Sequence, residues 1–200
     1  MQSFAIIRKL NFLKFQREFF VTDLQTQNIL FVVKENKLTF VQKILRLLDI
    51  SETSFGFKMF SMNNTVLFSF YKSFTLLASR TTFTDADTTN IAFLKRRFFR
   101  PDNAKYILQT NEGNLFYTIK FDLYSFNYMI TDEDDNVLAK VISNSQEVIE
   151  TRARLTHNGS RFSSLYIIHF SETLSDDFFK QKLFASVAIC IDLIFMDIQD

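Results

Sequence analysis

The chain has 200 residues, and its 23 lysines and arginines against 22 aspartates and glutamates leave a formal net charge of +1. This balance argues against a strongly basic nucleic-acid-binding protein, and we expect no nucleic-acid partner. Hydrophobic residues make up 47% of the chain and charged residues 22%, which is typical of a folded globular protein and excludes the composition of a disordered one.

The first nine residues are apolar over too short a stretch to form a secretory signal, and their charges follow the apolar residues. We therefore expect a cytoplasmic protein. The length suits a single domain of residues 1–200, and nothing rich in proline or serine marks a linker between two domains.

Four segments of the chain show the pattern of a β-hairpin, in which two alternating apolar runs flank a polar turn. They span residues 19–33, 57–71, 106–117 and 128–139. Further strands are expected at residues 39–48, 74–77, 91–99, 148–155 and 165–170, and the polar stretch 79–90 is interpreted as a long loop. So many short strands predict an all-β meander, which tends to curl or close because closure removes exposed strand edges.

The C-terminal segment departs from this pattern and predicts a helix. Residues 175–177 offer an N-cap with acidic residues, and the run Leu183–Met196 carries Asp192 as its one charge. Fourteen helical residues span about 21 Å, against about 30 Å for the hydrocarbon core of a bilayer. A helix buried in a protein core is therefore favoured over the alternative, a membrane span.

This C-terminal segment also carries a resemblance to a known superfamily. Residues 177–185 and 191–197 resemble the end of phospholipid scramblases, with a Lys-x-Lys pair followed by an apolar run and Ile-Asp. Residues 128–132 and 137–143 are similar to a strand, turn and strand that precede it. Scramblases belong with the LURP-one-related proteins and the tubby C-terminal domain, and the resemblance covers residues 12–197.

The resemblance implies a mainly β fold, a closed antiparallel barrel of about twelve strands around a central hydrophobic C-terminal helix. On that helix it places Lys180, Lys182, Cys190 and Asp192. It implies activity at a membrane, since scramblases move lipids between leaflets and tubby domains bind phosphoinositides. Many LURP-one-related members have no assigned activity, so a soluble interaction or ligand-binding module is the alternative.

The resemblance to scramblases also implies calcium binding, but the calcium-linked acidic segment of that family is not matched in this sequence. The corresponding residues 155–164 contain no carboxylate. The acidic turn at residues 132–136 lacks the glycine and the distal glutamate of an EF-hand, so we interpret it as a solvated hairpin tip. One cysteine and the two histidines His157 and His169 offer no zinc site. We predict no metal and no cofactor.

Enzymatic activity is not expected either. With three glycines, the chain contains neither a dinucleotide-binding nor a phosphate-binding glycine loop. Serines are plentiful, but no G-x-S-x-G elbow presents one as a nucleophile.

The best candidate for a functional site is a basic and aromatic segment. Lys95, Arg96, Arg97 and Arg100 enclose two phenylalanines, a combination that suits anionic lipid headgroups at a membrane interface. The alternative is a basic edge strand that resists aggregation. Lys14, Arg17, Lys43 and Arg46 could extend the segment. We expect the protein to bind phospholipid headgroups peripherally, at the plasma membrane or an internal membrane, with scrambling as an activity to test and protein partners unknown.

Overall fold

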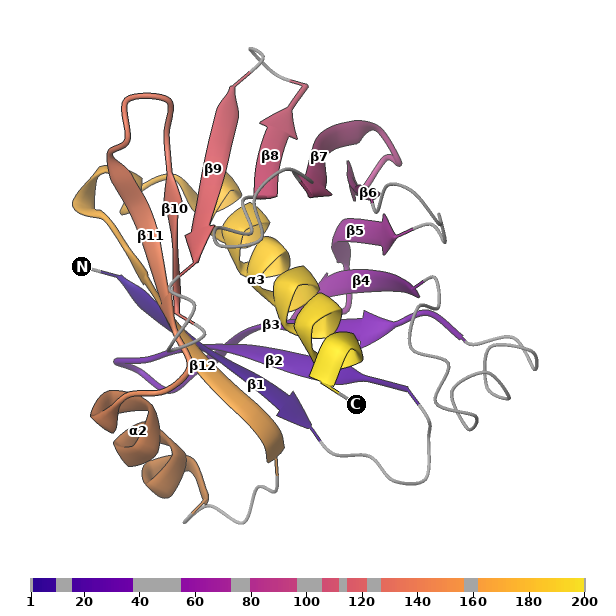
Figure 1. Cartoon of the computed structure of the whole chain (residues 1–200). Helices are drawn as coiled ribbons and strands as arrows, with labels where there is room; N and C mark the ends of the chain where they lie inside the picture. Colours follow the sequence, from indigo (N-terminus) through magenta and orange to yellow (C-terminus); the bar gives the residue numbers. More distant parts are fainter. Residues whose placement is uncertain are drawn as a thin grey trace.

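The computed structural model describes residues 2–9, 16–37, 55–72, 80–96, 106–111, 115–121, 127–156 and 162–199. In this part of the chain, twelve strands form a closed barrel around a long helix, and a second helix lies outside (Figure 1). Each strand pairs with its neighbours in the sequence, always antiparallel, and β1 closes the barrel by pairing with β12. The predicted closed antiparallel barrel around a C-terminal helix is confirmed.

The strands are β1 (Ser3–Lys9), β2 (Glu18–Asp23), β3 (Ile29–Glu35), β4 (Phe55–Ser61), β5 (Val66–Lys72), β6 (Arg80–Asp85), β7 (Asn90–Arg96), β8 (Tyr106–Thr110), β9 (Phe116–Phe121), β10 (Tyr128–Thr131), β11 (Val137–Ile142) and β12 (Phe162–Phe170). The helices are α2 (Gln146–Thr156), the short 3-10 helix η1 (Glu172–Leu174) and α3 (Phe178–Gln199). All four predicted hairpins are present, as β2–β3, β4–β5, β8–β9 and β10–β11.

Helix α3 is apolar on every side because the barrel surrounds it. It begins where predicted, at Asp177, whose carboxylate accepts the backbone N–H of Lys180 at 2.9 Å. Residues 183–191, 193 and 194 are all buried, and Asp192 is the half-buried exception. Among the described residues, no helix combines the length and the apolar content that crossing a bilayer requires.

Phenylalanine fills the space between α3 and the strands. Alternate residues of each strand point inward, so a strand contributes two or three large side chains to the interior. Phe4 packs edge-on against Phe170 across the β1–β12 closure, with the ring centres 4.9 Å apart. Tyr117 packs edge-on against Phe184 of α3, with the ring centres 5.2 Å apart. This packing accounts for much of the high phenylalanine content without any bound ligand.

The two ends of the barrel differ. At one end, which we call the hairpin end, β2–β3, β4–β5, β6–β7 and β10–β11 turn tightly and α3 begins. Strands β1, β3, β5 and β7 finish at the opposite end, where α3 also finishes, and we call this the C-terminal end (Figure 1). Three tight turns share one design, in which Asp23, Asp85 or Asp132 accepts backbone N–H groups from the turn through its carboxylate.

Three predictions are wrong. Residues 148–155 were expected as a strand, but they lie in α2, which packs on the outside of β1 and β12 through Val148, Leu165 and Ile167. The stretch 79–90, expected as a long loop, contains β6, whose inward Thr81 and Phe83 are buried. The barrel also begins at Ser3, earlier than the core of residues 12–197 that the resemblance implies.

Other expected strands fall partly or wholly on undescribed residues. The strand at 91–99 corresponds to β7, and the one at 165–170 lies within β12. Residues 39–48 and 74–77 lie outside the described residues, as do 97–99.

Candidate functional site

Of the predicted basic segment, Lys95 is the member whose side chain the structure describes. It lies on the outer face of β7, exposed to solvent, and its position pairs with Arg80 of β6 on one side and with Ile107 of β8 on the other. Arg96 pairs through its backbone position with Tyr106. Arg97 and Arg100 lie outside the described residues.

Arg80 is a neighbour of Lys95 that sequence reasoning missed, because it lies in the stretch interpreted as a loop. Both side chains are exposed on the outer face, directly across the β6–β7 ladder. The guanidinium carbon of Arg80 lies 3.6 Å from the centre of the Phe93 ring, a close cation–π contact. Like charges directly opposite each other in a sheet are destabilising, so the fold places two cations together at a cost in stability.

For Lys95 and Arg96, the alternative explanation of a basic edge strand is wrong. Strand β7 pairs with β6 on one side and β8 on the other within a closed barrel. It therefore has no free edge to protect from aggregation.

Among the other cations that could extend the segment, Arg17 is described and Lys14, Lys43 and Arg46 are not. Arg17 is half-buried and precedes β2 at the C-terminal end of the barrel, where its backbone N–H donates to the Glu35 carboxylate at 3.0 Å. Lys72 finishes β5 at the same end, and its ammonium lies 5.6 Å from the centre of the Phe55 ring.

The four predicted residues of α3 divide between the two ends of the barrel. Lys180 lies at the hairpin end, with its ammonium 2.9 Å from the Asp177 carboxylate, a hydrogen bond that raises the pKa of Lys180. Lys182 also lies there, within 6 Å of the Phe68 and Phe178 rings, and its burial lowers its pKa. The structure therefore does not bring these lysines near Lys95, which lies toward the other end.

Asp192 and Cys190 lie toward the C-terminal end of the barrel, inside it. Burial raises the pKa of Asp192 to about 6, while Arg8 and Arg17 act to lower it. Burial also raises the pKa of the Cys190 thiol well above its ordinary value, so the thiol stays protonated at neutral pH.

Two tyrosines share the interior with Asp192. Burial raises the pKa of Tyr128 and of Tyr166 well above the ordinary value, and the Asp192 charge adds to both shifts. Neither hydroxyl has a hydrogen-bond partner in the described part of the protein. Sequence reasoning identified Asp192 but not these tyrosines, because they lie on β10 and β12, far from α3 in the sequence.

A polar array outside the barrel attaches α2 to it. His169 of β12 lies with Nδ1 at 2.8 Å from the Ser3 hydroxyl of β1 and with Nε2 at 3.1 Å from the Glu147 carboxylate of α2. A serine, a histidine and a carboxylate also make up hydrolase triads, but here Ser3 is buried beneath the helix. The array therefore fixes α2 in place, and His169 serves as a strand histidine that joins β12, β1 and α2.

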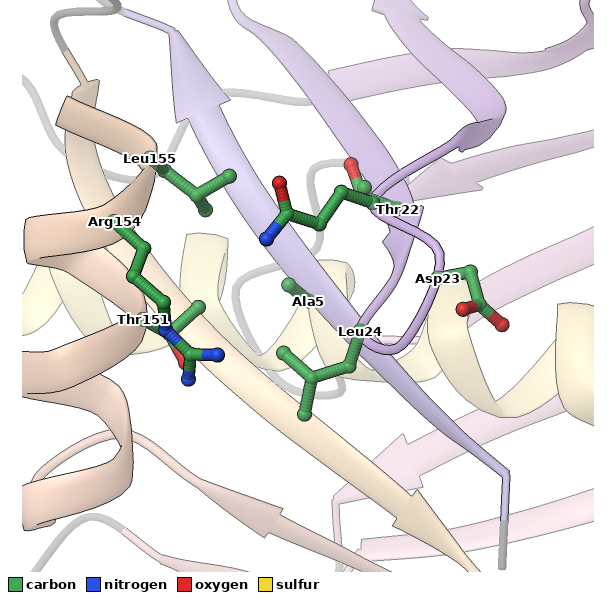
Figure 2. Close-up of a pocket in the computed structure, with 8 residues that line it drawn as sticks. Ala5, Thr22, Asp23, Leu24, Thr151, Arg154 and Leu155 are labelled. Atoms are coloured by element: carbon green, nitrogen blue, oxygen red, sulfur yellow. The ribbon is translucent and has the colours of Figure 1, made fainter. Parts of the chain in front are cut away.

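A small pocket lies beside this array, between α2 and the β1–β2 face. Figure 2 shows Thr151, Arg154 and Leu155 of α2 across from Ala5 and Leu24. The space holds about one water molecule, which is far too little for a lipid headgroup or a cofactor.

The described residues offer no metal centre. No three histidine, cysteine or carboxylate side chains gather closely enough there to hold an ion. In the acidic turn, Asp132 accepts the N–H groups of Asp134 and Asn136 and the Asn136 amide, which lowers its pKa. The turn is the tip of the β10–β11 hairpin, and the Asp132 carboxylate stabilises it by accepting these hydrogen bonds.

No family model, no curated protein and no solved structure matches the chain.

Proposed function

We propose that this protein binds anionic phospholipid headgroups at a membrane surface, without catalysing a reaction. The observation that carries the proposal is the pair of exposed cations at Arg80 and Lys95, placed directly opposite each other across β6–β7. A like-charge pair of this kind opposes folding, and a bound anion removes the repulsion. A phosphate group accepts hydrogen bonds from both a guanidinium and an ammonium group.

The surroundings of the pair suit a lipid headgroup. Phe93 lies beneath the Arg80 guanidinium, and Tyr71, on the neighbouring strand β5, is 52% exposed. Tyrosines are enriched at membrane interfaces, where the ring contacts the acyl boundary and the hydroxyl contacts water. Cations beside such a ring supply the attraction to an anionic leaflet, about 1 kcal/mol for each one near the surface.

The resemblance to scramblases and tubby domains agrees with this proposal, and the site on β6 and β7 does not depend on it. The proposed location is peripheral, on the cytoplasmic face of the plasma membrane or an internal membrane. Movement of lipids between leaflets is a separate activity, which the same vesicles would report through the accessibility of a fluorescent lipid to a membrane-impermeant reductant.

Vesicle co-sedimentation with a matched pair of variants tests the proposal. Lys95→Ala removes a cation from the proposed site, and Lys140→Ala removes an exposed strand lysine from the outer face of β11. With phosphatidylserine vesicles, we expect Lys95→Ala to lower the affinity about fivefold and Lys140→Ala to leave it almost unchanged. Equal effects of the two variants would contradict the site. A wild-type protein that stays in the supernatant would favour the soluble interaction module instead.

A further inference from the structure

Charged side chains are segregated along the axis of the barrel. In the described part of the chain, the cations at the C-terminal end are Arg8, Lys9, Arg17, Lys34, Lys37, Lys72, Arg80 and Lys95, against Glu18, Glu35 and Asp192. At the hairpin end the acids include Asp23, Asp85, Asp87, Asp132, Glu133, Asp134, Asp135, Glu172, Asp176 and Asp177, against Lys120, Arg154, Lys180 and Lys182. The charges of the described residues are therefore polarised along the barrel axis.

Three carboxylates oppose the eight cations at the C-terminal end, so the described charge there stays positive. Glu18 lies 3.7 Å from the Lys34 ammonium, and Glu35 is buried, accepting the Arg17 N–H. Asp192 is inside the barrel and has a pKa raised to about 6. Lys9, Lys37 and Lys95 are all exposed on the outside.

The distance between the two ends determines whether an anionic surface at one end is also affected by the charges at the other. Strands of six or seven residues rise about 3.3 Å per residue, so the ends lie roughly 20 Å apart. The screening length at physiological salt is about 8 Å. An anionic surface in contact with one end therefore attracts the cations there and is screened from the acids at the other.

The distribution of these cations around the barrel suits a flat anionic surface better than a linear one such as a nucleic-acid strand. The cations lie on or beside β1, β2, β3, β5, β6 and β7, within an arc of seven of the twelve strands of the closed ring. A bilayer can contact that whole arc at once, whereas a nucleic-acid strand would follow a part of it.

Three of these outer cations lie against phenylalanine rings of a neighbouring strand. Lys9 lies over Phe20, Lys34 over Phe60 and Arg80 over Phe93. Tyr71, exposed on β5, adds an interfacial aromatic residue to the same arc.

We propose that the barrel docks end-on, with the β1–β7 arc of its C-terminal end against an anionic bilayer and the acidic hairpin end facing away. The inference rests on the proposed membrane binding and adds to it the orientation and the extent of the contact. The Arg80–Lys95 pair is then one part of a larger basic surface that includes Lys9 and Lys37.

Fluorescent labels at the two ends of neighbouring strands test this orientation. Tyr71→Cys places a label at the C-terminal end, and Met62→Cys places one at the hairpin end, where Met62 is 61% exposed. Neither change alters the charge. Cys190 is completely buried, so maleimide chemistry on the folded protein is selective for the introduced thiol. The vesicles contain phosphatidylserine and a lipid-borne quencher.

End-on docking predicts that lipid quenching of the Tyr71→Cys label exceeds that of the Met62→Cys label several-fold. It also predicts that Lys9→Ala and Lys37→Ala each weaken binding about fivefold, whereas Asp87→Asn and Asp134→Asn change it less than twofold. Circular dichroism confirms that each variant is folded.

The contrary outcomes separate the two proposals. Vesicle binding with equal quenching at both ends, or stronger quenching at Met62→Cys, overturns the orientation and leaves membrane binding intact. Wild-type protein that binds heparin but no anionic vesicle overturns both. If Lys95→Ala loses vesicle binding while Lys9→Ala and Lys37→Ala keep it, the contact is restricted to β6–β7. That result overturns the proposal that the whole β1–β7 arc contacts the bilayer.

Discussion

Arg80 and Lys95 face each other across β6 and β7 with both side chains exposed on the outside of a closed barrel. Neither strand is an edge, so protection from aggregation does not account for the pair. Like charges at opposite positions oppose folding, and the proposed binding of an anion would account for the pair.

Stability and binding should therefore change in opposite directions at Lys95. Replacing it with threonine, a good strand residue, removes the repulsion, and we expect the free energy of unfolding to rise by a few tenths of a kcal/mol. Vesicle affinity should fall in the same variant. Urea denaturation and co-sedimentation measure the two effects, with Lys140→Thr as the control that changes neither strongly. A loss of stability in Lys95→Thr would show that the lysine is there for the fold.

Asp192 should make the protein less stable as the pH rises. Burial raises its pKa from 3.8 to about 6, so the folded chain holds this proton more tightly than the unfolded chain does. The contribution of this group is thus most favourable below pH 4, is lost as the pH rises from about 4 to 6, and stays lost above. The difference in pKa corresponds to about 3 kcal/mol.

Asp192→Asn tests this account because the amide does not ionise. We expect its free energy of unfolding to exceed that of the wild type at pH 7.5, by up to about 3 kcal/mol, and to approach it at pH 4. Urea titrations at four pH values between 4 and 7.5 would measure the difference. A variant that is less stable than the wild type at pH 7.5 would contradict this account. It would mean that the attraction of Arg8 and Arg17 for the Asp192 carboxylate outweighs the cost of burying its charge.

Thr88 offers a separate test of the turn design at the hairpin end. It has a φ of 66°, in the left-handed region that β-branched residues rarely adopt. Thr88→Gly should raise the free energy of unfolding by about 1 kcal/mol, because glycine adopts this conformation without a steric cost. Thr89→Gly is the control, since Thr89 has no positive φ and should gain nothing. Equal effects at both positions would contradict the turn geometry.

The attachment of α2 depends on His169. His169→Ala removes the contacts to Ser3 and Glu147, and we expect faster amide hydrogen exchange across residues 146–156 with the barrel strands unchanged. Lys140→Ala, at the position that pairs with His169 on β11, serves as the control. Faster exchange throughout β1 and β12 would instead show that the histidine stabilises the barrel closure.

The sequence predicts the hairpins well because the turn chemistry is local. An aspartate or asparagine that accepts nearby N–H groups marks the turns at Asp23 and Asp132, and alternation marks the strands around them. Helix α3 is equally visible, because an apolar run of this length with an Asp177 cap has few other interpretations.

Strand β1 is less visible for a physical reason. Its residues Phe4 and Ile6 face α3 inside the barrel while Ala5 faces the apolar surface of α2, so both faces are buried and no alternation is seen. Strand β6 is missed for the opposite reason, since threonines occupy three of its six positions and make it look polar.

The sequence contains helix signals for α2, although the strand prediction at residues 148–155 did not use them. Ser145 accepts the Val148 N–H as an N-cap, Glu147 lies in the first turn and Arg154 in the last. The Arg80–Lys95 pair and the cluster of Asp192 with Tyr128 and Tyr166 depend on strand register, which no local pattern contains.

The most direct test of the central claim is flotation of the detergent-free wild-type protein with phosphatidylserine or phosphoinositide vesicles, in the presence of a calcium chelator, at low and physiological salt. Phosphatidylcholine vesicles are the control. The proposed headgroup site predicts flotation with the anionic vesicles alone, without calcium, and weaker binding at the higher salt. A monodisperse protein that stays at the bottom of the gradient with every vesicle would contradict it.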